Sequence, residues 1–173
     1  MNNSDKIILD LCGGSGSWSK PYMDNGYDVR LITLPDYDVR TYQPPKKVYG
    51  ILAAPPCEAF SNAGRGHIKN PSMDLETGLN IVNACMNIIN ICEIEKFWAL
   101  ENPATGNLIR YIGQPTMVFQ PYEYGDGWAK KTAIWGDFQI PRKTHTWESC
   151  PKLNLYIRPG RGKPSLAFQH KSA

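Results

Sequence analysis

A thiol and a carboxyl group each follow a short apolar run, and they stand about 45 residues apart. Cys57 comes after two prolines in "LAAPPCEAFS", and Glu101 is followed by Asn102 and Pro103. A thiolate can attack an electrophilic carbon while a neighbouring carboxylic acid protonates the substrate. Each residue alone also has a plain structural interpretation, because buried cysteines and carboxylates at strand ends are common. Together they predict a catalytic pair, provided that the fold brings them into one cleft.

A glycine-rich segment, "DLCGGSGSW" at residues 10–18, follows the first apolar run. Glycine lets a backbone approach a ligand closely, and the N–H groups at the start of a helix are free to bind one. Asp10 adds a carboxylate at the end of the preceding strand. The segment therefore predicts either a ligand-binding loop or a simple tight turn.

The elements that must position these groups alternate between strands and helices. Apolar runs predict strands at residues 6–10, 27–34, 48–54, 97–101, 116–124 and 131–138. Helices are expected at residues 18–25, with Ser17 as the N-cap, and at 76–95 and 105–111. This order predicts an α/β fold with a largely parallel sheet and helices on both faces. Ligands bind beyond the carboxyl ends of such strands, where the thiol, the carboxyl group and the glycine-rich segment all fall.

The composition is that of one folded domain of 173 residues with a basic end. Residues 142–173 hold seven lysines and arginines against one acidic residue. The chain therefore divides into a catalytic domain at 1–141 and a basic Pro/Gly-containing tail at 142–173. The tail suits a polyanionic partner such as nucleic acid, or it is a solvated charged end.

Other features of the composition exclude some functions. The five cysteines include no C-x-x-C pair, so neither a disulfide framework nor a zinc site is expected. The three histidines show no ligand spacing either, and no metal is expected. No run is long and apolar enough to span a bilayer. We expect a reducing, cytoplasmic setting and no membrane partner.

The order of four motifs, "DLCGGSGSW", "APPCEAFS", "LENP" and "QPYEYGDGWAKKTAIWG", resembles that of the DNA cytosine-5 methyltransferase family. The likeness covers most of residues 6–138, and its most specific part is Pro-Pro-Cys followed by Glu-Asn. It implies an S-adenosylmethionine-dependent methyltransferase (Rossmann-like) fold. It also implies transfer of a methyl group from S-adenosyl-L-methionine to C5 of cytosine, through a covalent cysteine adduct.

The resemblance implies roles for individual residues. Cys57 looks like the nucleophile that adds to C6 of cytosine, Glu101 like the acid that protonates N3, and Asn102 like the residue that fixes the loop. C5 becomes nucleophilic enough to accept a methyl group only after this addition. The implied cofactor-binding residues are Asp10, Cys12, Gly13, Gly14, Gly16, Trp18, Asp36, Asp38 and Pro55. The implied substrate-binding residues are Pro56, Ser61, Arg65, Lys130 and Lys131. Segment 62–72 is predicted to close over the substrate.

The chain departs from the family in three places. The second predicted strand ends at Leu34 and Pro35, without the acid that usually binds the cofactor ribose. Tyr122 and Tyr124 stand where arginines are expected. Only about 35 residues follow Phe138, too few for the family's target-recognition domain. Base readout typically buries about 1,000 Å² or more of protein surface, and a base in a duplex must also be flipped out.

Three functions therefore stay open. The first is a cytosine-5 methyltransferase with low sequence specificity, with a partner subunit for base recognition, or with single-stranded DNA or a nucleotide as its substrate. The second is a related transferase that uses a modified cofactor and makes a different 5-substituted pyrimidine. The third is a catalytically inactive module that binds nucleic acid or protein.

Overall fold

The computed structural model describes residues 2–60 and 73–151. Two of the predicted substrate-binding residues, Ser61 and Arg65, lie outside the described residues. So do the predicted closing segment 62–72 and most of the predicted basic tail.

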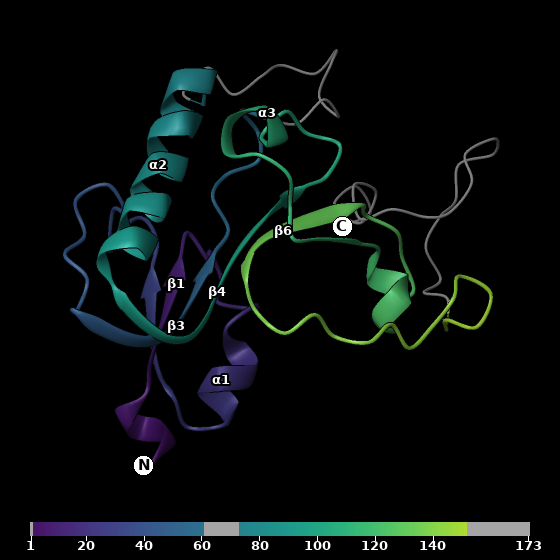
Figure 1. Ribbon diagram of the computed structural model, residues 1–173, viewed down its shortest axis with the longest axis horizontal. Helices are drawn as coiled ribbons and strands as arrows, with labels where there is room; N and C mark the ends of the chain where they lie inside the picture. Colours follow the sequence, from purple (N-terminus) through teal and green to yellow (C-terminus); the bar gives the residue numbers. More distant parts are fainter. Residues whose placement is uncertain (1, 61–72, 152–173) are drawn as a thin grey trace.

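Six strands form one sheet, and α2 is the longest helix of the described chain (Figure 1). The strands are β1 (Ile7–Leu11), β2 (Asp28–Ile32), β3 (Lys47–Ala53), β4 (Glu93–Pro103), β5 (Met117–Phe119) and β6 (Thr132–Asp137). The α-helices are α1 (Lys20–Asp24), α2 (Leu75–Ile91) and α3 (Ile109–Ile112). Two 3₁₀ turns, η1 (Asn3–Asp5) and η2 (Pro121–Tyr124), complete the elements.

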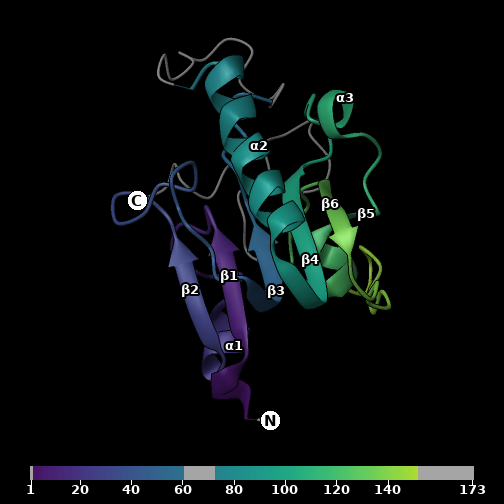
Figure 2. The same ribbon diagram turned by 60° about the vertical axis from the view of Figure 1, so that its left-hand side comes forward.

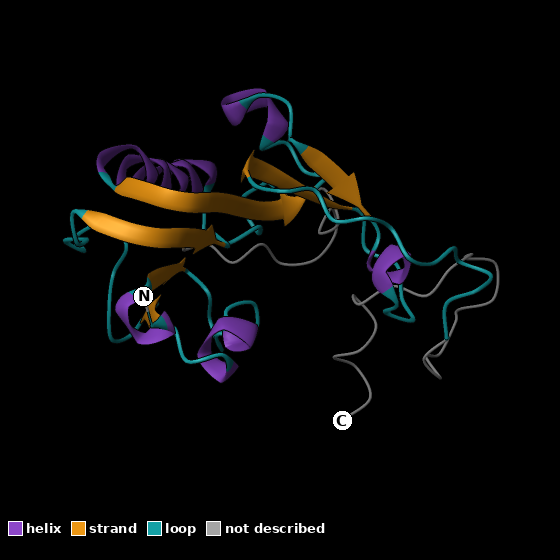
Figure 3. Ribbon diagram, turned by 60° about the horizontal axis from the view of Figure 1, so that its bottom comes forward, coloured by secondary structure: helices purple, strands orange, loops and turns teal. Residues whose placement is uncertain are grey.

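The sheet is mixed, with the strand order β2-β1-β3-β4-β6-β5. Strands β2, β1, β3 and β4 are parallel, as Figure 2 shows, whereas β6 runs antiparallel to both of its neighbours, β4 and β5. The expected Rossmann-like methyltransferase architecture, with a largely parallel sheet and helices on both faces, is wrong. Among the described residues, α2 is the only long helix and covers one face (Figure 3), while α1 has five residues and α3 four.

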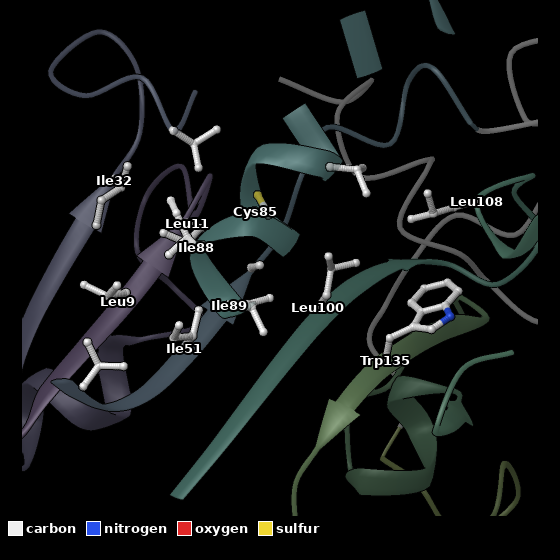
Figure 4. Packing of buried hydrophobic residues seen from close by; sticks show 14 of the residues in the cluster. Leu9, Leu11, Ile32, Ile51, Cys85, Ile88, Ile89, Leu100, Leu108 and Trp135 are labelled. Atoms are coloured by element: carbon white, nitrogen blue, oxygen red, sulfur yellow. The ribbon is translucent and has the colours of Figure 1, made fainter. Parts of the chain in front are cut away.

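The hydrophobic core lies between α2 and one face of the sheet (Figure 4). On the helix, Val82, Cys85 and Ile88 are buried, whereas a stripe of Glu76 and four asparagines is exposed. Alternate sheet residues such as Leu9, Ile51 and Leu100 meet the helix and are fully buried. Burying each such side chain contributes roughly 1.5–3 kcal/mol relative to leaving it in water. This face therefore supplies most of the packing that holds the strands in place.

Helix α1 begins two residues later than expected, at Lys20, with Ser19 instead of Ser17 as its N-cap. Pro21 marks this start, because proline is tolerated in the first turn of a helix, where its missing N–H costs little. The Ser19 hydroxyl does not cap the helix, since it donates to the Asp10 carboxylate instead.

Several other boundaries differ from the sequence prediction, and α3 begins at Ile109 rather than at 105. Helix α2 ends at Ile91 rather than 95, and β4 begins at Glu93 because residues 93–94 pair with the start of β3. The expected strand 116–124 stops at Phe119, since Pro121 cannot donate to a ladder and instead opens η2. In the last two cases, long-range pairing or proline geometry overrides the local apolar pattern.

None of the helices in the described part of the chain has the length and apolar character needed to cross a membrane.

Candidate active site at the ends of strands β1, β3 and β4

Two adjacent parallel strands bring the predicted thiol and carboxyl group to the same edge of the sheet. Ala53, the last residue of β3, is in register with Leu100 of β4, directly before Glu101. Cys57 follows β3 by four residues. The exits of β3 and β4 therefore lie side by side, with the cysteine on one and the carboxyl group on the other.

The loop that carries Cys57 is bound to β4 and to the turn after it. The buried Asn102 side chain donates from Nδ2 to the Pro55 carbonyl oxygen over 3.0 Å. At the other end of the loop, the Phe60 carbonyl accepts from the Asn107 backbone N–H over 2.9 Å, and the Phe60 side chain is 1% exposed. Because Pro55 and Pro56 also restrict the backbone, Cys57 is held on a rigid corner.

Charged groups surround the Cys57 thiol. Burial raises the pKa of this thiol, the nearby Lys130 ammonium group lowers it, and the Glu101 carboxylate raises it again. The Lys130 Nζ lies 3.4 Å from the Glu101 Oε1, so the two form an ion pair. The net direction is upward, and the resting cysteine is a thiol. Lys130 is the described cation placed to favour its thiolate form.

The Asp10 carboxylate is buried at the end of β1. The Ser19 hydroxyl donates to its Oδ2 over 2.5 Å, and Oδ1 has no partner among the described residues. Burial raises the pKa of Asp10, and the bond from Ser19 lowers it in part. A Cβ at position 13 would lie 2.2 Å from Oδ1, so only glycine lets the loop pass this carboxylate. Gly14 and Gly16, with φ of 57° and 71°, complete the turn.

A cavity of about 230 Å³ opens between the ends of β1 and β2 and the start of α2. Its polar wall includes Cys12, Thr33, Tyr37 and Asp38, and Pro56 places it next to the Cys57 loop. The Asp38 carboxylate accepts from the Arg40 Nε over 2.9 Å and from the Arg40 backbone N–H, and these bonds lower its pKa. Asp38 therefore faces the cavity with its carboxylate already paired.

Some predicted site residues lie elsewhere. Asp36 is exposed in the turn after β2 and does not line this cavity. Trp18 lines a separate apolar cavity on the sheet face opposite α2. Lys131 lines a third cavity with Pro103 and Trp135, away from Glu101. The described site thus brings together Cys57, Glu101, Asn102 and Lys130, with the glycine-rich loop and Asp38 beside them.

Sequence reasoning missed two parts of this region. It did not assign Ser19 a role at Asp10, although Pro21 marks the helix start that places this serine. It also did not identify the aromatic residues of the cavity that contains Trp18. The alternation of Phe97, Ala99 and Glu101 along one strand was the available signal, since alternate residues share a face.

Comparison of the chain with protein-family models gave no match, and a search of the curated proteins also gave none. The case for a function therefore rests on the residues and their geometry.

Proposed function

We propose that the protein is a cytosine C5 methyltransferase-like enzyme, with Cys57 as the nucleophile and S-adenosyl-L-methionine as the methyl donor. The observation that carries the proposal is the bond from Asn102 to the Pro55 carbonyl. It fixes the Pro-Pro-Cys corner against the strand that carries Glu101. A nucleophile and an acid on two rigid, adjacent supports favour the proposal, because adding a thiol to a ring while protonating it needs both groups to be held in place.

Each residue of the proposed site has a defined task. The Glu101 carboxylate takes the proton of the Cys57 thiol and, as the acid, gives it to N3 of cytosine while the thiolate forms a bond to C6. The addition moves electron density to C5 and so makes this atom nucleophilic enough to accept a methyl group. Loss of the C5 proton to a solvent base, return of the N3 proton to Glu101 and cleavage of the S–C6 bond then release the product and the thiolate. Lys130 assists by lowering the pKa of the thiol. Bound S-adenosyl-L-methionine would supply the electrophilic methyl group, and the sulfur would keep the electron pair of the broken S–CH₃ bond as S-adenosylhomocysteine leaves.

The residues around the glycine-rich loop fit one end of this cofactor. The cavity beside Cys12, Thr33 and Asp38 is large enough for a flat ring, although drug-sized ligand pockets usually measure about 300–1,000 Å³. Because residue 13 is a glycine, no side chain of its own covers the backbone of the loop next to Asp10. We propose that the nucleoside lies against Asp38 and that the methionine part follows the loop toward Cys57.

The substrate that suits this site is a cytosine that does not need to be read within a duplex. The described residues form one small sheet and contain no second core that could read base pairs. We therefore propose single-stranded DNA or a cytosine nucleotide as the substrate. A partner subunit would be needed for sequence-specific modification of duplex DNA. A reducing cytoplasm, which keeps Cys57 as a thiol, is the proposed setting.

Incubation with methyl-labelled S-adenosyl-L-methionine and a series of cytosine substrates tests the proposal. We expect label in 5-methylcytosine, and a loss of about a thousandfold or more in Cys57→Ala, because the nucleophile is removed. Cys92→Ala, which removes a thiol at the far end of the sheet, is the matched control and should keep its activity. Failure of every substrate to take up label, or full activity in Cys57→Ala, contradicts the assignment.

Two observations favour a second candidate, a transferase that uses a modified sulfonium cofactor. The Asp38 carboxylate is paired with Arg40, and β2 ends at Ile32 without an acid directly after it. Both features alter the polar contacts that a plain nucleoside would find. Mass spectrometry of the modified base separates the candidates, because the second predicts a group heavier than methyl at C5.

A further inference from the structure

A cavity of about 500 Å³ lies on the sheet face opposite α2, and none of the functions above uses it. Its wall combines six aromatic side chains with smaller apolar ones from β3, β4, β5 and β6. The aromatic residues are Trp18, Tyr22, Phe97, Phe119, Tyr124 and Phe138. All six are half-buried, so part of each ring remains accessible. A volume of this size lies in the range of small-molecule and nucleotide sites.

The rings are held in place by the sheet and by each other. Phe97 lies over Gly50, where a Cβ would come within 2.5 Å of the ring. Tyr22 stacks on Phe97 with centroids 5.6 Å apart, and Phe119 meets Tyr124 edge-on at 5.5 Å. These contacts fix the ring planes on two sides of the cavity. A preformed aromatic wall of this kind suits a flat ligand that stacks.

The cavity lies on the face of β4 that also carries Glu101, the proposed catalytic carboxyl group. Ala99 is two residues before Glu101 on the same face of β4, a rise of roughly 7 Å. Ile134, in register with Glu101, and Met117, in register with Ile134, both line the cavity. A chain with its reacting base at Cys57 and Glu101 could therefore place a neighbouring base in the cavity.

A lysine of the cavity wall and an arginine that adjoins the wall in the sequence match a polyanion. Lys96 lines the cavity, and Arg142 directly follows the lining residue Pro141. Neither forms an ion pair within the described parts of the chain. The nearby Asp137 is in register with Trp98, which places it on the α2 side of the sheet. Positive groups beside stacking rings are the arrangement used to bind single-stranded nucleic acid.

We propose that this cavity binds an unpaired base that neighbours the target cytosine in single-stranded nucleic acid, with Lys96 and Arg142 contacting its phosphates. The inference rests on the proposed function, since it names a strand rather than a free nucleotide as the substrate. Every base has an aromatic face, so the cavity holds the strand without reading its sequence. The cavity would therefore contribute affinity for the strand, and the described residues include no target-recognition domain that could do so.

The experiment measures binding of two fluorescent octamers by anisotropy, one of deoxyadenosine and one abasic with the same phosphates. Neither contains cytosine, so the result is independent of catalysis. We expect the full chain to bind the adenine octamer about tenfold more tightly than the abasic octamer. Phe119→Leu, which removes one ring, should reduce this ratio toward one, whereas Tyr111→Leu, an exposed ring on α3, should keep it. Urea denaturation of each variant establishes that it is folded.

A second pair of variants tests the phosphate contacts. Lys96→Ala should weaken binding of both octamers equally and reduce its dependence on salt, and Lys47→Ala, at the far end of β3, should change it less. Equal affinity of the wild type for both octamers overturns the inference, as does an unchanged ratio in Phe119→Leu.

A self-association that Phe119→Leu abolishes, without base-dependent binding, would assign the cavity to a second copy of the chain and also overturn the proposal. Methylation of a free cytosine nucleotide without base-dependent binding would leave the proposed function standing and remove this inference alone. Base-dependent binding without methyl transfer would support the cavity as a nucleic-acid site and contradict the proposed methyltransferase activity.

Discussion

The two faces of the sheet are formed by the same strands but differ in the side chains that they carry. On the α2 face, Leu9, Ile51 and Leu100 form a dry apolar layer under a long helix. On the opposite face of the same strands lie Asp10 and Glu101, and half-buried aromatic rings line a cavity on this face. Because successive side chains of a strand alternate, one residue of β4 stabilises the fold and the next is free for chemistry. Stability and the proposed function are therefore separable along a single strand.

The largest expected effect is a difference in the free energy of unfolding between variants on the two faces of the sheet. Leu100→Ala removes a fully buried side chain on the α2 face and should lower the free energy of unfolding by about 3 kcal/mol. Phe97→Leu, on the same strand but the opposite face, should cost about 1 kcal/mol, because the ring is only half-buried. Urea denaturation of both variants measures the difference. Equal losses would show that the aromatic face carries as much of the stability as the core.

The next effect concerns the connection between β4 and the cysteine loop. Asn102→Ala should lower the free energy of unfolding by about 2 kcal/mol, because it leaves the Pro55 carbonyl without its buried donor. The exposed Asn80→Ala on α2 is the matched control and should change stability by less than about 0.5 kcal/mol. Thermal and urea unfolding report both. If the two variants behave alike, the loop is not held through Asn102.

The smallest effect concerns the charges around the thiol. Lys130 lowers the pKa of Cys57 and Glu101 raises it, so Lys130→Ala should slow alkylation of Cys57 below pH 9 and Glu101→Gln should speed it, each by about threefold. Burial holds the pKa of Cys57 above its ordinary value, so the rate in the wild type should still be rising at pH 9.

Peptide mass spectrometry after timed exposure to iodoacetamide gives the rate at each cysteine. Cys92, at the other end of the sheet, serves as the internal control, and its rate should be the same in all three proteins. Changes of the same sign in Lys130→Ala and Glu101→Gln would refute an electrostatic origin.

Much of the parallel half of the fold could be predicted from the sequence, because its signals are local. The apolar runs of β1 and β3 and the exposed asparagine stripe of α2 each define an element without help from the rest of the chain. The reversed direction of β6 could not be predicted in this way. Its pairing with β4 joins residues such as Asn102 and Ala133, and no local pattern encodes the direction of a strand.

The candidate site could likewise be predicted only in part. The parallel order of β3 and β4 was sufficient to place Cys57 and Glu101 at one edge of the sheet. The position of Lys130 beside Glu101, rather than of Lys131, depends on where β6 begins and which way it runs. Adjacent residues at the start of a strand face opposite ways, so a difference of one residue decides which lysine reaches the carboxylate.

The insertion of β6 between β4 and β5 has a consequence for the nascent chain. The ribosome completes β4 at residue 103 and β6 at residue 137. The outer edge of β4 therefore remains unpaired for a time on the order of a few seconds, until β6 has been synthesised. During that interval the N–H and C=O groups along the outer edge of β4 can pair with another chain. Fragments that end before residue 132 keep this edge permanently open, and they should aggregate where the full chain does not.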